Sequence, residues 1–275
     1  MNCRLLPQVI ASLCTAAFAF ASGVQPEGQP TNVISLAPDV QQEITRVVTV
    51  LSAGDMSEEA VQEVVKEFKS FKNKPPQELL LQVLAVYGGK EEYRSNPRVE
   101  MAKRLLFSNL LQGMTPSDVV AAVAPKYEQT SDPKLEYGLR QALGMATLRG
   151  GRVDSVDPDF GVFSIYIGQN KDQPPRKLIE FMYGHNPQVA VLSMARIYGD
   201  KTTESQLADL FKGDPKRVVQ SFADRPEWWV RLYVPAVMKK NSKFRDEALL
   251  KKLEQDDNPL VREKVSKLKD QLQPK

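Results

Sequence analysis

A polar residue followed directly by proline recurs along most of the chain, and this pair constrains the fold more than any other feature of the sequence. Aspartate, asparagine or threonine at an N-cap accepts a hydrogen bond from a backbone amide that has no helical partner. Proline suits the next position because its missing N–H would have stayed unpaired there. Each pair therefore predicts the start of a helix. The pairs are Asn96-Pro97, Thr115-Pro116, Asp132-Pro133, Asp157-Pro158, Asn186-Pro187, Asp214-Pro215 and Asn258-Pro259.

Apolar residues follow most of these starts at the three- and four-residue spacing of an amphipathic helix. Before each such helix lies another apolar segment, so the pattern predicts helical hairpins in series. The first helices of the hairpins are expected at residues 80–87, 119–123, 178–183, 207–222 (with an interruption) and 249–253. The apolar positions of the second helices include Val99, Ala102, Leu106 and Leu110; Leu135, Leu139, Ala142 and Ala146; and Val261, Val265 and Leu268.

The N-terminal part of this region follows the same pattern. One helix is expected from Asp39 to Leu51. A second is expected to open at Asp55, where Glu58 three residues later would complete a capping box.

Residues 157–173 depart from the pattern. Phe163, Ile165 and Ile167 alternate with other residues as they would on one face of a strand. Phe160, Phe163 and Ile167 also fit a helical period, and Asp157-Pro158 is the start signal used elsewhere. The segment can therefore be a strand or a helix, and we favour the helix.

The prolines near the starts of the second helices recur at solenoid-like intervals. Pro97, Pro133, Pro187, Pro226 and Pro259 are separated by about 36, 54, 39 and 33 residues, and most of these intervals lie near the periods of helical repeat proteins. A hairpin in such a series cannot bury its apolar face alone, so neighbouring hairpins are expected to stack.

The segment Asp257-Asn258-Pro259-Leu260-Val261-Arg262 resembles the second helix of a HEAT-type repeat, in which an acidic turn precedes a Val-Arg pair. Pro226 to Val237 matches more loosely, with Val230 and Arg231 as the pair. The segments that begin at Asn96 and Asn186 have the turn and the valine, but Glu100 and Ala190 replace the arginine.

This resemblance to HEAT-like (armadillo-type) repeats covers most of residues 75–275. It implies an all-α fold: a right-handed stack of about five to six antiparallel helical hairpins, an α-solenoid, which we expect to occupy residues 38–275. In that family the arginine braces the turn of a neighbouring repeat, so the resemblance implies a structural role for Arg231 and Arg262.

The N-terminus has the features of a secretory signal peptide at residues 1–21. Arg4 provides a basic start, Leu5 to Ala16 form an uncharged apolar run, and Ala19-Phe20-Ala21 is a small-x-small cleavage site. Residues 22–37 are expected to be a flexible leader. The mature chain would then be exported, periplasmic or secreted, without an integral membrane segment; a signal retained as an anchor is the alternative. The chain has no Asn-x-Ser/Thr acceptor, which favours a bacterial envelope.

Signal cleavage would also change the chemistry that the chain can support. It removes Cys3 and Cys14, the only cysteines, and so excludes disulfides, a cysteine nucleophile and thiolate metal sites in the mature chain. The 37 Lys and Arg residues fall to 36 with the loss of Arg4, against 34 Asp and Glu, which leaves a net charge of 36 − 34 = +2. That balance argues against a nucleic-acid partner.

The sequence predicts no catalytic residue, metal ligand or cofactor-binding residue. His185 is the only histidine, lies in a predicted turn, and cannot supply a site that needs two imidazoles. The acid pairs Glu58/Glu59 and Glu91/Glu92 have the composition expected of exposed helix faces, because adjacent helical residues point in different directions.

The group Trp228, Arg231 and Tyr233 is the candidate partner-binding site. Tryptophan, arginine and tyrosine dominate the energetics of protein interfaces, so an exposed Trp228 beside Arg231 would form an anchor for another protein. The alternative is that these aromatic residues, including Trp229, fill the core.

Three functions are compatible with these features. We favour an exported, non-enzymatic module that binds another protein or an extended peptide in the cell envelope, because stacked hairpins present a long surface. An enzyme whose carboxylate or Ser/Lys site assembles only in three dimensions is the second. An envelope protein that binds peptidoglycan, lipid or a small ligand is the third.

Overall fold

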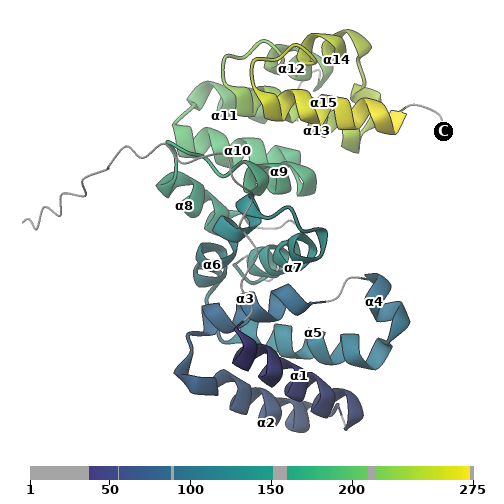
Figure 1. Ribbon diagram of the computed structural model, residues 1–275. Helices are drawn as coiled ribbons and strands as arrows, with labels where there is room; N and C mark the ends of the chain where they lie inside the picture. The colour runs from purple at the N-terminus through teal and green to yellow at the C-terminus, as the bar shows by residue number, and fades with distance from the viewer. Residues whose placement is uncertain (1–36, 55, 88–89, 151–159, 210–214, 273–275) are drawn as a thin grey trace, which may run out of the picture. The chain divides into compact units, whose positions relative to one another are not determined.

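The computed structural model describes residues 37–54, 56–87, 90–150, 160–209 and 215–272. Every regular element in these ranges is a helix (Figure 1), which confirms the all-α fold class for the described residues. These helices belong to one compact unit, residues 32–275. The helices are α1 (Pro38–Ala53), α2 (Glu58–Lys69), η1 (Phe71–Asn73), α3 (Pro76–Val86), α4 (Lys90–Ser95), α5 (Pro97–Gln112), α6 (Pro116–Gln129), α7 (Pro133–Gly150), α8 (Gly161–Gln169), α9 (Arg176–His185), α10 (Pro187–Tyr198), α11 (Lys201–Asp209), α12 (Pro215–Phe222), α13 (Trp228–Lys240), η2 (Ser242–Phe244), α14 (Glu247–Leu253) and α15 (Pro259–Leu272).

The predicted polar-proline starts coincide with helix starts wherever both can be compared. The Asn96 side chain accepts a hydrogen bond from the Val99 amide at 3.3 Å, and Asn186 does the same for Val189 at 3.3 Å. Helices α5, α6, α7, α10, α12 and α15 all begin at the proline of their pair. Asp157-Pro158 and Asp214 lie outside the described residues.

One capping box was predicted at the wrong place. Helix α2 begins at Glu58 with Ser57 as its N-cap, so Glu58 is the first helical residue and cannot be the third. Asp55 lies outside the described residues. A capping box instead opens α6, where the Thr115 hydroxyl accepts from the Asp118 amide at 3.2 Å and the Asp118 carboxylate accepts from the Thr115 amide at 3.3 Å.

Two further boundaries differ from the prediction. Helix α13 begins at Trp228, two residues after Pro226, because Glu227 is its N-cap. The short helix α4, directly before α5, was not predicted.

The segment that could be a strand or a helix is the helix α8 from Gly161 onward. Phe163 and Ile167 are buried, whereas Ile165 is 60% exposed. A strand would have placed all three side chains on one face, so the helical period decided their burial. The favoured prediction for this segment is confirmed for its described part.

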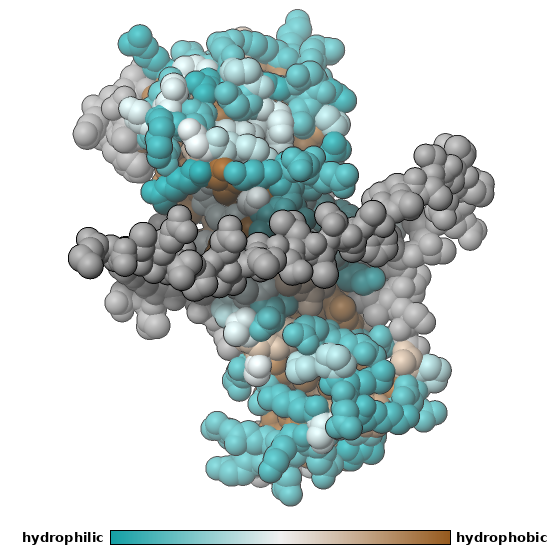
Figure 2. Space-filling view, turned by 90° about the vertical axis from the view of Figure 1, so that its left-hand side faces the viewer, coloured by the Kyte–Doolittle hydropathy of each residue, from teal (hydrophilic) through white to brown (hydrophobic). Residues whose placement is uncertain are grey.

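The core consists of the apolar faces that the sequence pattern identifies. Leu106, Leu139, Val261 and Val265 are fully buried. The two helices of each predicted pair contact one another, and the pairs contact their neighbours through α1 with α5, α3 with α7, α6 with α9, α10 with α13 and α13 with α15. The face drawn in Figure 2 is predominantly hydrophilic where it is coloured. None of the described helices combines the length and the apolar content needed to cross a bilayer.

Candidate functional site

Four cavities that share lining residues in series lie mainly among α6, α7, α9, α13 and α15, and we call them together the groove. The first cavity has a volume of about 700 Å³ and lies between α7 and the last turns of α9. The second, third and fourth have volumes of about 310, 460 and 480 Å³. Successive cavities share lining residues: Arg140 and His185 line the first and second, Glu180 and Lys267 the second and third, and Glu128 and Arg176 the third and fourth.

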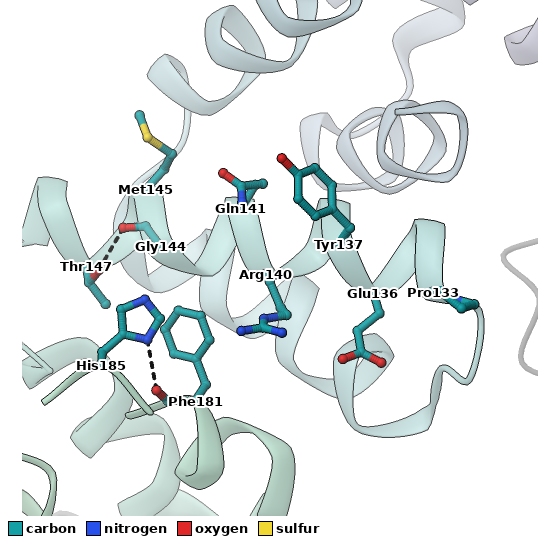
Figure 3. A pocket seen from close by; sticks show the side chains of 10 residues that line it. All are labelled: Pro133, Glu136, Tyr137, Arg140, Gln141, Gly144, Met145, Thr147, Phe181 and His185. Carbon is teal, nitrogen blue, oxygen red and sulfur yellow. Dashed lines mark hydrogen bonds between the residues drawn. The ribbon is translucent and has the colours of Figure 1, made fainter. Parts of the chain in front are cut away.

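Helix α7 provides most of the first cavity through one polar and aromatic face. Glu136, Tyr137, Arg140 and Gln141 recur at the spacing of a helix face and line the cavity, and Gly144 continues that face one turn later. In Figure 3, Glu136 and Arg140 project from α7 toward the side on which Phe181 and His185 of α9 lie.

His185 is positioned by its own helix. Its ring packs on the ring of Phe181 with centroids 4.1 Å apart, and its Nδ1 lies 2.9 Å from the Phe181 carbonyl oxygen. The ring therefore lines the first and second cavities with a fixed orientation. His185 is the last residue of α9 and not a loop residue as predicted.

Glu128 of α6 fixes the other end of α9. Its carboxylate accepts hydrogen bonds from the backbone amides of Lys177 at 3.0 Å and Leu178 at 2.8 Å. These amides have no partner within the helix, and Pro175 at the N-cap offers no side-chain acceptor. Burial raises the pKa of the Glu128 carboxyl above its ordinary value, although the amides oppose this shift. Glu128 is thus a structural cap that joins two walls of the groove.

The second cavity is lined by more cations than carboxylates. Arg140, Lys239, Lys264 and Lys267 face Glu136 and Glu180 there. Glu180 is 3.0 Å from the Lys264 Nζ and 3.6 Å from the Lys267 Nζ. Burial raises the pKa of Glu180, but the two lysines lower it by more, so its pKa lies below the ordinary value. We call this space the cationic cavity.

Of the three residues predicted to bind a partner, only Trp228 lines the groove. It is half-buried, packs partly against the core and forms part of the fourth cavity. Tyr233 is 1% exposed and packs edge-to-face on Phe222 at 5.4 Å. Trp229 is buried as well, at 3% exposure. Tyr233 and Trp229 therefore belong to the core.

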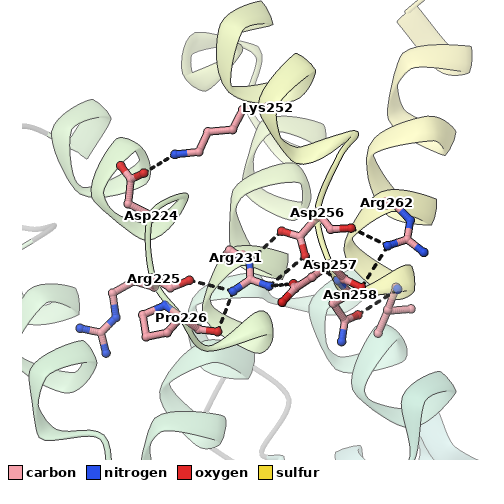
Figure 4. Close-up of polar contacts among 10 residues, drawn as sticks. Asp224, Arg225, Pro226, Arg231, Lys252, Asp256, Asp257, Asn258 and Arg262 are labelled. Carbon is pink, nitrogen blue, oxygen red and sulfur yellow. Dashed lines mark hydrogen bonds and ion pairs between the residues drawn. The ribbon is translucent and has the colours of Figure 1, made fainter.

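Arg231 of α13 has a buried side chain that reaches the turn before α15 (Figure 4). Its Nε and Nη2 donate to the two carboxylate oxygens of Asp256 at 2.7 and 2.9 Å, and its Nη1 donates to the carbonyls of Arg225 and Pro226. Nη2 also contacts Asp257. Arg231 thus braces the acidic turn that precedes α15.

Arg262 braces the same acidic turn from the opposite direction. Its Nη1 donates to the carbonyls of Asp256 at 2.5 Å and Asp257 at 3.0 Å. The turn is its own rather than that of a neighbouring repeat. Arg98 of α5, which was not singled out from the sequence, donates to the carbonyls of Ser52 in the last turn of α1 at 2.7 Å and of its C-cap Gly54 at 2.8 Å.

The groove was not predicted from the sequence. Its cations, such as Arg140 and Lys239, are about one hundred residues apart and resemble ordinary solvated helix residues. One local signal was present: the residues of α7 between Glu136 and Gly144 place charge, amide and aromatic groups on a single helix face.

The described residues contain no group of three or more His, Cys, Asp or Glu side chains arranged to hold a metal ion. The four carboxylates that line the third cavity, Glu128, Glu136, Glu180 and Glu263, have backbone or lysine partners. Comparison with known proteins provides no relative: no family model, no curated protein and no solved structure matches the chain.

Proposed function

We propose that the chain is an exported, non-enzymatic α-solenoid of about five to six helical hairpins whose groove binds an extended segment of another protein in the cell envelope. Two sets of contacts support the solenoid: the helices of each pair contact one another, and each pair contacts the next along the chain. Helical repeats of this kind bury their apolar faces by stacking and leave a long surface free.

The succession of four cavities with shared lining residues is the observation that carries the proposal. Four cavities that overlap in series fit an extended ligand better than a compact one. An extended peptide presents side chains alternately along its length, and successive cavities can receive them. Aromatic side chains line each part of this path, as in protein interfaces. They are Tyr137 and Phe181 in the first cavity, Tyr127 in the second and third, and Tyr166 and Trp228 in the fourth.

An enzyme assembled from carboxylates has less support. A catalytic acid or base needs a carboxylate that can exchange a proton with substrate. Glu128 caps α9, and Glu180 is held by Lys264 and Lys267. The raised pKa of Glu128 follows from its burial as a cap.

Filling the groove tests the proposal. A Cβ added at Gly144 meets no atom within 4 Å, so a side chain can start there, and Gly144→Trp would place an indole at the wall of the first cavity. Gly168 in α8 has the same free space and lines none of the four cavities, so Gly168→Trp is the matched control. Both changes replace a helical glycine and should leave the helices intact.

Peptides selected on the wild-type chain from a displayed library of unstructured sequences would be measured by fluorescence anisotropy. We expect Gly144→Trp to weaken their binding by at least roughly tenfold, which corresponds to about 1.4 kcal/mol, and Gly168→Trp to leave it unchanged. Equal binding by both variants, or no enriched peptide, would contradict the proposal.

Export is tested separately by N-terminal sequencing of the exported chain, which should begin near Ser22.

A further inference from the structure

The cationic cavity is lined by four cations and two carboxylates, and Glu263 of the neighbouring third cavity pairs with one of the four cations, Lys267. Its two carboxylates already have partners: Glu180 lies beside Lys264 and Lys267, and Glu136 lies 3.8 Å from Lys177. Arg140 and Lys239 also line the cavity, and no ion pair joins either of them to another described residue. These two cations therefore remain available to a ligand.

Arg140 and Lys239 reach the cavity from different helices, α7 and α13. Both are exposed, whereas Lys264 has a side-chain exposure of only 12%. A carboxylate that enters the cavity would meet the guanidinium and the ammonium group together. Positive groups around a concave surface reinforce one another, because the protein walls screen them less than water does.

We propose that the partner segment is acidic and that one of its Asp or Glu side chains enters the cationic cavity between Arg140 and Lys239. This inference rests on the proposed function, because it assigns the charge of the segment that the groove would hold. The position of the cavity agrees with such an anchor: the second cavity adjoins the first and the third, so a side chain bound there would leave the peptide free to extend both ways.

The probe is a fluorescein-labelled peptide of alternating Glu and Ser, with its Gln-Ser counterpart as the uncharged reference. Binding of each peptide to the full chain would be measured by anisotropy at ionic strengths of about 0.01 and 0.15 M, where the Debye length is roughly 30 and 8 Å. We expect the Glu-Ser peptide to bind about tenfold more tightly than the Gln-Ser peptide at low salt, and less so at high salt.

The double variant Arg140→Gln/Lys239→Gln should remove this preference. The matched control is Arg245→Gln/Lys240→Gln, which removes one arginine and one lysine that are exposed and line none of the four cavities. We expect the control to retain the preference. Equal binding of the two peptides, or a preference that survives in the double variant, would overturn the inference.

Two further measurements distinguish an acidic peptide from a free anion, and this inference from the proposed function. Inorganic phosphate that binds as tightly as the Glu-Ser peptide would show a site for free anions and overturn the assignment to a peptide. If library peptides lose binding to Gly144→Trp but show no preference for acidic sequences, the proposed function stands and this inference fails. If acidic peptides bind equally to Gly144→Trp and Gly168→Trp, groove binding itself fails.

Discussion

Arg231 and Arg140 have the same guanidinium group, and the fold surrounds the two groups differently. Arg231 has a side-chain exposure of 10%, a bidentate ion pair with Asp256 and two backbone carbonyl partners. Arg140 is exposed on α7, lines two cavities and forms no ion pair with any described residue. Burial and partners thus make one arginine part of the scaffold and leave the other available for binding.

The largest expected effect comes from removing the partner of the buried arginine. Asp256→Ala leaves the charge of Arg231 without its bidentate acceptor in a buried turn, and breaking such a pair costs roughly 3–5 kcal/mol. Urea unfolding followed by circular dichroism measures the change in the free energy of unfolding. The control is Asp257→Ala, because Asp257 has a side-chain exposure of 84% and should contribute less than about 1 kcal/mol. Similar losses in both variants would contradict the comparison.

Acid should weaken the same ion pair. Burial raises the pKa of Asp256, but hydrogen bonds from Arg231 and the Asn258 amide outweigh it, so the folded pKa lies below 3.8. The ionised carboxylate therefore stabilises the fold above pH 3.8, and this contribution is lost as the pH falls through the lower folded pKa. The difference in unfolding free energy between wild type and Asp256→Ala should shrink over that range. A constant difference from pH 6 to acid would show that ionisation of Asp256 does not stabilise the turn.

Glu180→Gln should lower the unfolding free energy by less than Asp256→Ala does. The same change should strengthen the binding of the acidic peptide. The change removes the negative charge shared by Lys264 and Lys267, with a loss of about 1 kcal/mol in unfolding free energy. It also adds to the positive charge of the cationic cavity, so the Glu-Ser peptide should bind more tightly. Glu254→Gln, which loses a contact to Lys269 outside the groove, is the control and should not change peptide binding. Weaker binding by Glu180→Gln would contradict the charge argument.

Arg140→Ala should have the smallest effect on stability. An exposed side chain without an ion-pair partner is expected to change the unfolding free energy by no more than about 0.5 kcal/mol. Thermal unfolding of the variant beside Asp256→Ala gives the measurement. A loss as large as that of Asp256→Ala would place Arg140 in the scaffold and remove the contrast between the two arginines.

Much of the secondary structure followed from the sequence because its causes are local. An N-cap side chain such as Asn96 or Asn186 and the following proline act within three residues, so their pairs mark helix starts without reference to the rest of the chain. The prediction failed for the helix expected to open at Asp55, because α2 begins at Glu58 with Ser57 as its N-cap residue, and Ser57 is also of a type that is common at N-caps. Two suitable caps in one turn cannot be ranked from local chemistry alone.

The sequence by itself determined the helical class, the helix starts at the polar-proline pairs and the buried faces, because the spacing of apolar residues decides which side of a helix leaves water. Only the tertiary structure decided which charged side chains would have an ion-pair or hydrogen-bond partner. Arg231 meets Asp256 across 25 residues, and Arg140 and Lys239 line one cavity from helices α7 and α13. Such contacts between distant side chains depend on how whole helices pack against one another. The periodicity within a single helix does not specify that packing.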